Sequence, residues 1–210
     1  AKLERDVCEA YDKYEFHVVY QKVSQFIAVE LSSIYHDVIK DRLYTDPANS
    51  PRRRSTQTAL HRLVTGLCQM LAPILAFTAD EAWEFVPGKA ASSVHELAWR
   101  PAGFAISEAE LASWRSLFAL RELVLPELEK ARQGKQIGKA LEARLDVAGT
   151  VPTLADGKAH LESLRELLNV SQLSINTTGA PAISVAVTRA AGEKFERCWH
   201  WETEVGSNAE

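Results

Sequence analysis

The chain has 210 residues, of which 24 are Lys or Arg and 28 are Asp or Glu, so its formal net charge is −4 at pH 7. With 46% hydrophobic and 25% charged residues, its composition is that of a globular protein and excludes a disordered or fibrous chain. The mild negative charge excludes a uniformly basic nucleic-acid coat but allows local basic patches.

Three further features narrow the class of protein. The apolar runs are broken within a few residues, so we expect no membrane-spanning segment. Three widely spaced cysteines argue against a disulfide framework, and no secretory leader opens the sequence, so we expect a cytoplasmic location. The sequence opens inside a predicted helix and ends without a stop signal, so we expect a piece of a larger protein.

The first half of the chain is predicted to be helical. From Phe16, apolar residues recur at offsets 0, 3, 4, 7, 10 and 11, which predicts a helix with one buried stripe. We expect Ser32-Ser33 to interrupt this helix and a shorter helix to continue from Ile34 toward Tyr44.

Two helix starts follow. Ser50 is expected to be the N-cap of a helix that has Pro51 at its first position and runs until Pro73. Thr78, with Glu81 three residues later, is typical of a capping box and predicts a further helix from Ala79 to about residue 85.

The second half begins as helix and then changes period. Ser107 and Glu110 predict another capping box, and the helix that follows is expected to kink or restart at Pro126 before ending near residue 132. Residues 143–147 alternate between apolar and polar and predict a strand, followed by a short helix at 161–168 and strands near 173–175 and 183–187.

These patterns predict a mainly α fold, a helical bundle followed by a small α+β subdomain. We expect three parts: a bundle at 1–105, a helix with an α+β subdomain at 106–190, and a tail with Cys, Trp and His residues at 191–210. No glycine-rich phosphate loop, nucleophile elbow or shared His and carboxylate constellation occurs, so the sequence predicts no catalytic residue.

The first group with chemical potential is Arg52-Arg53-Arg54 at a predicted helix start. Positive charge there opposes the helix dipole by ~0.3–1 kcal/mol per residue. Together with Lys40 and Arg42, these arginines favour contact with a nucleic-acid phosphate backbone. The alternative is that they pair with neighbouring carboxylates, namely Asp41, Asp46, Asp80, Glu81 and Glu84.

A second basic group surrounds the glycines at 134 and 138. Its members are Lys130, Arg132, Lys135, Lys139 and Arg144. Such a loop between a helix and a strand either tracks phosphates or is simply solvated.

The third group is the tail. Cys198 and His200 supply at most two of the four ligands of a zinc site, so no metal site is expected here. Trp199 and Trp201 beside Arg197 favour a stacking platform for unpaired bases, although the two tryptophans could instead close over the small sheet.

Five strings in order resemble the bacterial-type isoleucyl-tRNA synthetases. They are LSSIYHDVIKDRLY (31–44), RRRSTQTAL (52–60), LAPILAFTADEAWE (71–84), LEKARQGKQIGKALEARL (128–145) and GEKFERCWHW (192–201). The KDRLY string and Leu71-Ala72-Pro73 favour this family over the valyl enzymes, in which a His before the Pro is expected.

The resemblance implies a class Ia anticodon-binding helical bundle joined to a junction subdomain. It implies a monomeric parent enzyme, without membrane attachment, that joins isoleucine to its tRNA using ATP and Mg²⁺, with this chain recognising the anticodon stem-loop and not catalysing. Arg197 and Trp199 would be anticodon contacts by matching position, while Arg52, Arg53, Arg54, Lys40 and Arg42 are candidates on electrostatic grounds alone.

One position departs from the family pattern. Phe195 stands where relatives usually carry the first Cys of a zinc pair, so Cys198 would be an orphan and zinc binding by the parent is doubtful. Two alternatives stay open: the equivalent region of a valyl-type synthetase, and a helical scaffold whose basic spots bind protein partners.

Overall fold

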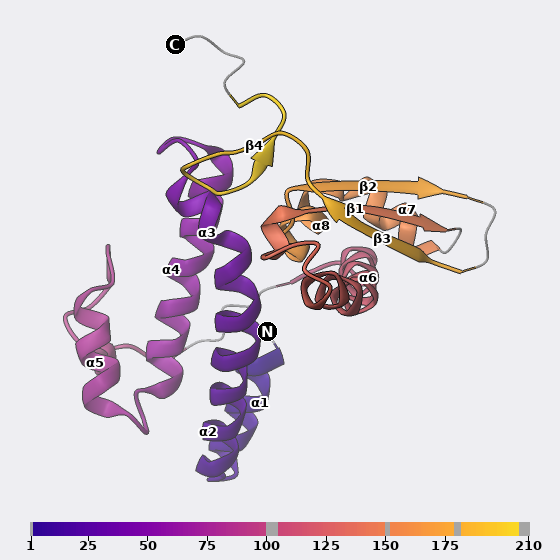
Figure 1. The fold of residues 1–210 in the computed structure, drawn as a ribbon. Coiled ribbons are helices and arrows are strands. Elements are labelled where there is room, and N and C mark those ends of the chain that lie inside the picture. The colour runs from indigo at the N-terminus through magenta and orange to yellow at the C-terminus, as the bar shows by residue number, and fades with distance from the viewer. Residues whose placement is uncertain (1, 100–104, 150–151, 179–181, 206–210) are drawn as a thin grey trace. The chain divides into compact units, whose positions relative to one another are not determined.

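The computed structural model describes residues 2–99, 105–149, 152–178 and 182–205. The chain divides into two compact units, residues 1–105 and 106–210, and each is described by itself (Figure 1). Among the described helices, none is both long and apolar enough to cross a membrane.

The first unit is entirely helical in its described part. Its elements are α1 (Lys2–Asp12), α2 (Phe16–Gln25), the π-helix η1 (Phe26–Tyr35), α3 (His36–Tyr44), α4 (Pro51–Leu71), α5 (Ala76–Glu84) and the short 3-10 helix η2 (Val94–Glu96). The second unit combines helices with two small sheets, so the predicted fold class, a helical bundle followed by a small α+β subdomain, is confirmed.

The expected interruption at Ser32-Ser33 is wrong. Residues 16–44 form one uninterrupted helical segment in which α2, η1 and α3 lie end to end (Figure 1). The Ser33 hydroxyl donates to the carbonyl oxygen of Val29 at 2.6 Å, so this serine bonds within the helix and does not end it. Burial of Leu31 in the same segment outweighs the weak helix propensity of the serine pair.

The core of the first unit includes two clusters of buried residues. In one, Val19 and Val23 of α2 pack with α1 and with Met70 of α4. In the other, Trp83 of α5 packs with Cys68 and with Val94. The buried stripe of α2 is narrower than its periodicity predicts, because Tyr20 is 69% exposed.

One of the two helix starts in this unit is as predicted. Ser50 caps α4, because its hydroxyl oxygen accepts the backbone N–H of Arg53 at 3.4 Å. The predicted start at Thr78 is wrong, since α5 begins at Ala76. The N–H of Leu75 donates to the carbonyl oxygen of Leu71 at 2.7 Å, so the chain re-enters a helix before it reaches Thr78.

The second unit is built on α6 (Glu108–Gln133). Ser107 caps this helix as predicted, accepting the N–H of Glu110 at 3.1 Å. The helix continues through Pro126 without restarting. Proline removes only the bond to the carbonyl of Glu122, an exposed residue whose carbonyl water can satisfy.

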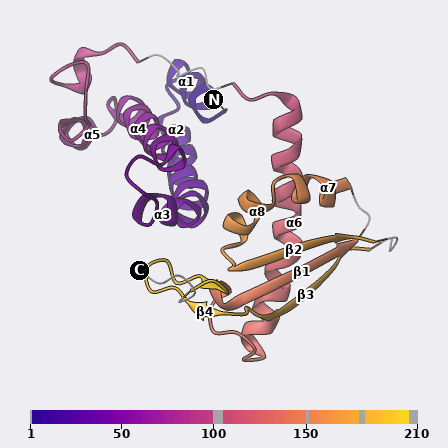
Figure 2. The ribbon, with the colours of Figure 1, turned by 90° about the horizontal axis from the view of Figure 1, so that it is seen from above.

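The predicted strands form a three-stranded sheet of order β2-β1-β3. They are β1 (Ala143–Gly149), β2 (Gln172–Thr177) and β3 (Ser184–Arg189), and β1 pairs parallel with β2 and antiparallel with β3. The parallel pair needs a crossover, which α7 (Pro152–Ala159) and α8 (Leu161–Leu168) supply. Leu145 and Val147 of β1 are buried. The helix α6 lies along one face of the sheet (Figure 2).

The end of the described chain forms a small hairpin. Its strands, β4 (Glu193–Lys194) and β5 (Trp201–Glu202), pair antiparallel. A short 3-10 helix, η3 (Ala140–Glu142), precedes β1 of the main sheet. Gly192 is required where the hairpin begins, because its φ is +91° and a Cβ there would lie 2.2 Å from the carbonyl oxygen of Glu202.

Two β2-side residues attach this hairpin to the sheet. The Ser171 hydroxyl oxygen accepts the backbone N–H of Trp201 at 2.7 Å, and the same hydroxyl donates to the carbonyl oxygen of Leu141. The Gln172 side chain exchanges hydrogen bonds with the backbone of Ala191 at 2.9 and 3.1 Å. The hairpin therefore belongs to the packed second unit.

Candidate nucleic-acid interface

The first two arginines of α4 fasten the loop that precedes the helix. The Arg52 guanidinium donates to both carboxylate oxygens of Asp46, at 2.8 and 2.6 Å. Arg53 donates to the carbonyl oxygen of Asp46 at 2.9 Å. The hydrogen bonds from Arg52 hold the pKa of Asp46 below its ordinary value. The alternative in which an arginine pairs with a neighbouring carboxylate therefore applies to Arg52, whose side chain nevertheless remains 46% exposed.

Arg54 differs from its two neighbours. Its side chain is exposed, and in the described part of the chain its guanidinium has neither an acceptor nor a carboxylate partner. It lines an open groove of about 590 Å³ on α4. The other lining residues are Ala48, Gln57, Thr58, His61, Arg62 and Pro87.

The two α3 candidates lie outside that groove's lining. Lys40 pairs with Asp37 one turn earlier, at 2.9 Å. Arg42 is half-buried, engaged within the fold, and its charge contributes to lowering the pKa of Asp46. Of the electrostatic candidates, the structure thus brings Arg42, Arg52 and Arg53 together around Asp46.

Two members of the basic group around the glycines at 134 and 138 are paired with neighbouring carboxylates. Lys130 pairs with Glu127 at 2.6 Å, and Arg132 donates to both carboxylate oxygens of Glu129 at 2.8 Å. The hydrogen bonds from Arg132 and from Gln133 lower the pKa of Glu129 to about 2. Lys139 instead extends its ammonium group over the ring of Trp199.

Trp199 stands out in the tail. Its ring is 51% exposed, and the ammonium groups of Lys139 and Lys194 lie 5.2 and 5.0 Å from the ring centre. Its backbone adopts a left-handed φ of +66°, and its N–H donates to the carbonyl oxygen of Phe195 at 2.8 Å. An exposed aromatic ring beside two cations is thus held at the tip of a hairpin. Arg197, also exposed, lies in the same turn.

Trp201 has a different environment. It is half-buried, its backbone N–H is bound by Ser171, and the Arg189 guanidinium lies 5.0 Å from its ring centre. The sequence left open that both tryptophans close over the sheet. Trp201 does so, whereas Trp199 faces outward.

The metal-type residues of the tail do not form a donor set. His200 places its Nδ1 3.4 Å from the hydroxyl of Ser171, and Cys198 is half-buried. Within the described ranges, no three His, Cys, Asp or Glu side chains converge in a way that could hold a metal ion. Among those residues, the donors do not fit a tetrahedral zinc site.

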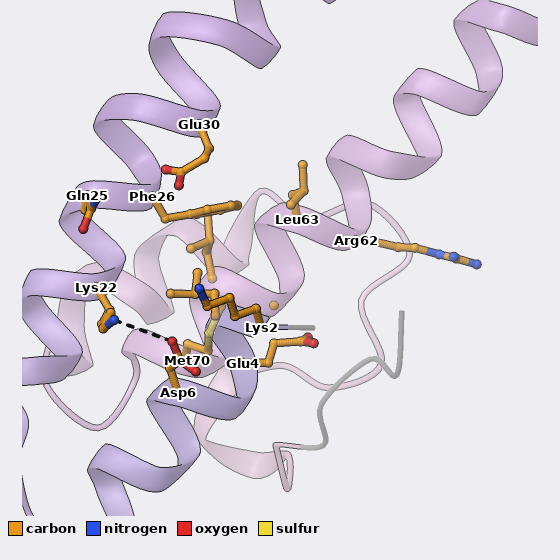
Figure 3. A pocket seen from close by; sticks show the side chains of 13 residues that line it. Lys2, Glu4, Asp6, Lys22, Gln25, Phe26, Glu30, Arg62, Leu63 and Met70 are labelled. Atoms are coloured by element: carbon orange, nitrogen blue, oxygen red, sulfur yellow. Dashed lines mark ion pairs between the residues drawn. The ribbon is translucent and has the colours of Figure 1, made fainter. Parts of the chain in front are cut away.

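A second concavity of about 410 Å³ lies between α1, α2 and α4 (Figure 3). Phe26, Leu63 and Met70 form an apolar wall of this concavity. Lys22 and Asp6, which also line it, form an ion pair at 3.7 Å. Its charged groups are of both signs, which does not favour a polyanion there.

Two features of these surfaces were missed by sequence reasoning. The lysines flanking Trp199 are 60 and 5 positions from it, and only the folded hairpin brings Lys139 to the ring. The groove on α4 did leave a signal: residues 51–71 contain four arginines and no Asp or Glu.

Comparison with known proteins agrees with the resemblance described above. A family model for the anticodon-binding domain of tRNA ligase matches residues 1–147. The isoleucine–tRNA ligase of Desulfitobacterium hafniense is 39% identical over 223 residues, covering 100% of this chain and 24% of that protein.

Two further relatives give the same result. The isoleucine–tRNA ligases of Pectobacterium carotovorum and Exiguobacterium sibiricum are 37% and 42% identical, covering 99% and 95% of this chain and 24% and 22% of those proteins. The predicted resemblance is confirmed, and the chain spans about a quarter of the length of the curated relatives it matches.

Proposed function

The chain belongs to the anticodon-binding domain family of tRNA ligases, and on that premise we propose that it recognises the anticodon stem-loop of an isoleucine tRNA. The observation that carries the proposal is the half-exposed ring of Trp199, with two lysine ammonium groups 5.2 and 5.0 Å from its centre. Sequence-specific RNA recognition targets single-stranded loops, whose unstacked bases stack on aromatic side chains.

In this proposal, Trp199 stacks on a base of the anticodon loop. Lys139, Lys194 and Arg197 lie in or beside the same turn and supply positive charge for the phosphates that flank such a base. Trp201 has a supporting role, because its backbone ties the hairpin to Ser171.

The relatives' name extends the proposal to the longer protein. We propose that the parent joins isoleucine to its tRNA, using ATP and Mg²⁺ in regions beyond this chain, and works as a cytoplasmic monomer. Its anticodon contacts then come from residues described here. We propose that the described tail holds no zinc by itself, because Cys198 and His200 supply at most two of the four ligands of a tetrahedral site.

The test is a titration of this chain, followed by tryptophan fluorescence, with isoleucine and valine anticodon stem-loops at two salt concentrations. Tighter binding of the isoleucine stem-loop, weakened by salt, is expected because phosphate contacts release counterions. Equal binding of both stem-loops would contradict isoleucine specificity. Absence of salt-sensitive binding would instead favour the protein-interaction scaffold.

A further inference from the structure

The helix α4 carries positive charge and no negative charge in its sequence. Its 21 residues contain four arginines and one histidine but no carboxylate. Asp46, which precedes the helix, engages Arg52 and Arg53 at its first turn. Of the remaining arginines, Arg54 has no side-chain partner among the described residues, whereas Arg62 is engaged within the fold; both line the groove of about 590 Å³ on the side of the helix.

The groove follows one face of the helix. Its α4 residues stand at 54, 57, 58, 61 and 62, and the spacings of three, four, seven and eight place them in one row. With a rise of 1.5 Å per residue, Arg54 and Arg62 are about 12 Å apart along the helix axis. Two guanidinium groups at that separation can reach different phosphates of one strand.

One wall of the groove is fixed by a hydrogen bond. His61 Nε2 lies 3.0 Å from the carbonyl oxygen of Pro87, and since a carbonyl oxygen only accepts, this nitrogen carries the proton. The bond holds the imidazole beside Arg62 and brings Pro87, which follows α5, to the edge of the groove.

The residues that line the groove favour contact with the phosphate backbone of a polyanion. Among the described residues that line the groove, none is acidic, and the donors include two guanidinium groups and the Gln57 amide, which match phosphate oxygens. The described lining holds no Phe, Tyr or Trp, and its one aromatic ring, the imidazole of His61, is tied to the carbonyl oxygen of Pro87. Phosphate contacts of this kind position a nucleic acid without reading its sequence.

We propose that this groove on α4 binds the phosphodiester backbone of tRNA, separately from the Trp199 hairpin, and adds affinity without sequence preference. The inference rests on the proposed function for its choice of RNA. The groove favours RNA over an acidic protein segment because only Ala48 and Pro87 offer apolar contact, whereas protein interfaces depend on buried apolar and aromatic anchors.

The test compares two isosteric substitutions with the same change in net charge. Gln57→Glu places a carboxylate in the groove, whereas Gln21→Glu places one on exposed α2, outside it. Both variants, Arg54→Gln and the unmodified chain are titrated with full-length isoleucine tRNA and with the same tRNA carrying an altered anticodon, at several salt concentrations. Circular dichroism checks that the helices are retained.

We expect Gln57→Glu and Arg54→Gln each to weaken the binding of both tRNAs by the same factor. Gln21→Glu should bind both tRNAs like the unmodified chain. The slope of log K against log salt should fall in magnitude by about 0.7–0.9 for each phosphate that the variant no longer neutralises. Polyglutamate, used as a competitor, should not displace tRNA at matched charge concentration.

Three results would overturn the inference. If the unmodified chain binds tRNA with anticodon preference but Gln57→Glu equals Gln21→Glu, the groove is not a phosphate site and the proposed function stands. If polyglutamate competes as well as tRNA and Gln57→Glu abolishes that competition, the groove takes an acidic polypeptide. If the unmodified chain binds no tRNA, the inference and the proposed function fail together.

Discussion

A single side chain, Trp199, tests whether the chain reads bases. Stacking of a base on an aromatic ring contributes ~1–3 kcal/mol, as judged by alanine substitution. We therefore predict that Trp199→Ala weakens binding of the isoleucine stem-loop by that amount and narrows its advantage over the valine stem-loop. Fluorescence anisotropy with a labelled RNA measures both affinities without depending on the removed tryptophan.

A matched variant controls for loss of a tryptophan as such. Trp114 on α6 is 37% exposed and lies outside the tail, 6.4 Å from the ring of Phe118. Trp114→Ala should leave the ratio of the two affinities unchanged. A ratio that falls equally in both variants would show that Trp199 has no stacking role.

The ion pair of Arg52 with Asp46 predicts a pH dependence of stability. The pKa of Asp46 is lowered in the folded chain, so between the folded and unfolded pKa values the folded state binds fewer protons. The stabilisation is thus complete above the ordinary value of ~4 and is lost as the pH falls through the lower, folded value. Arg52 is 46% exposed, so we expect Arg52→Ala to cost ~1 kcal/mol or less at pH 7.

Urea unfolding at a series of pH values measures this effect. The difference between the unmodified chain and Arg52→Ala should be constant above about pH 5 and should shrink below about pH 4. Arg54→Ala is the control, since its guanidinium has no carboxylate partner among the described residues. A constant difference down to pH 2 would mean that Arg52 stabilises the chain by packing.

At the scale of elements, replacing the first residue of each predicted capping box should have different effects on stability. Ser107 accepts the N–H of Glu110 at the start of α6, and replacing such a cap by alanine costs ~0.5–2 kcal/mol. Thr78 lies inside α5, where alanine has the higher helix propensity. We predict that Ser107→Ala lowers the free energy of unfolding by ~1 kcal/mol and that Thr78→Ala does not lower it. Equal losses in chemical denaturation would contradict this assignment of the caps.

Local patterns predicted most elements, because periodicity and caps are properties of neighbouring residues. The helix from Ser50 and Pro51, the helix from Ser107 and the alternation at 143–147 all have such signals. The errors arose where tertiary contacts override local preference, as at Ser32-Ser33. The crossover helix α7 was not predicted, and it exists because the parallel strands β1 and β2 need one.

The candidate site was predictable only in part, for the same reason. Residues close together in the sequence, such as Arg197 and Trp199, could be identified as a candidate pair from the sequence alone. The approach of Lys139 to Trp199 depends on how the hairpin folds back, which no local pattern encodes. Likewise, the engagement of Arg52 and Arg53 by Asp46 depends on the loop conformation before α4.

For the molecule as a whole, the two proposed RNA contacts divide affinity from selectivity. The hairpin offers a ring for bases, whereas the groove on α4 offers guanidinium groups for phosphates. Substitutions in the hairpin should therefore change the ratio of affinities for two anticodons. Substitutions in the groove should change the salt dependence and leave that ratio alone.

Ser171 tests this division without touching RNA in the proposal. Its buried hydroxyl accepts the N–H of Trp201 and donates to the carbonyl of Leu141, so it ties the hairpin to the sheet. Ser171→Ala leaves the Trp201 N–H without this acceptor, which costs ~1–3 kcal/mol. We predict that the variant loses anticodon selectivity while the slope of log K against log salt stays the same. Stem-loop titrations at several salt concentrations provide both readouts.

Ser174 supplies the matched control on the neighbouring strand β2. Its hydroxyl donates to the carboxylate of Asp146 and, among the described residues, makes no bond to the hairpin. Ser174→Ala should therefore reduce stability without changing selectivity. If Ser174→Ala and Ser171→Ala lose selectivity equally, the loss reflects general destabilisation of the second unit. If neither variant loses it, the position of the hairpin relative to the sheet does not contribute to anticodon discrimination.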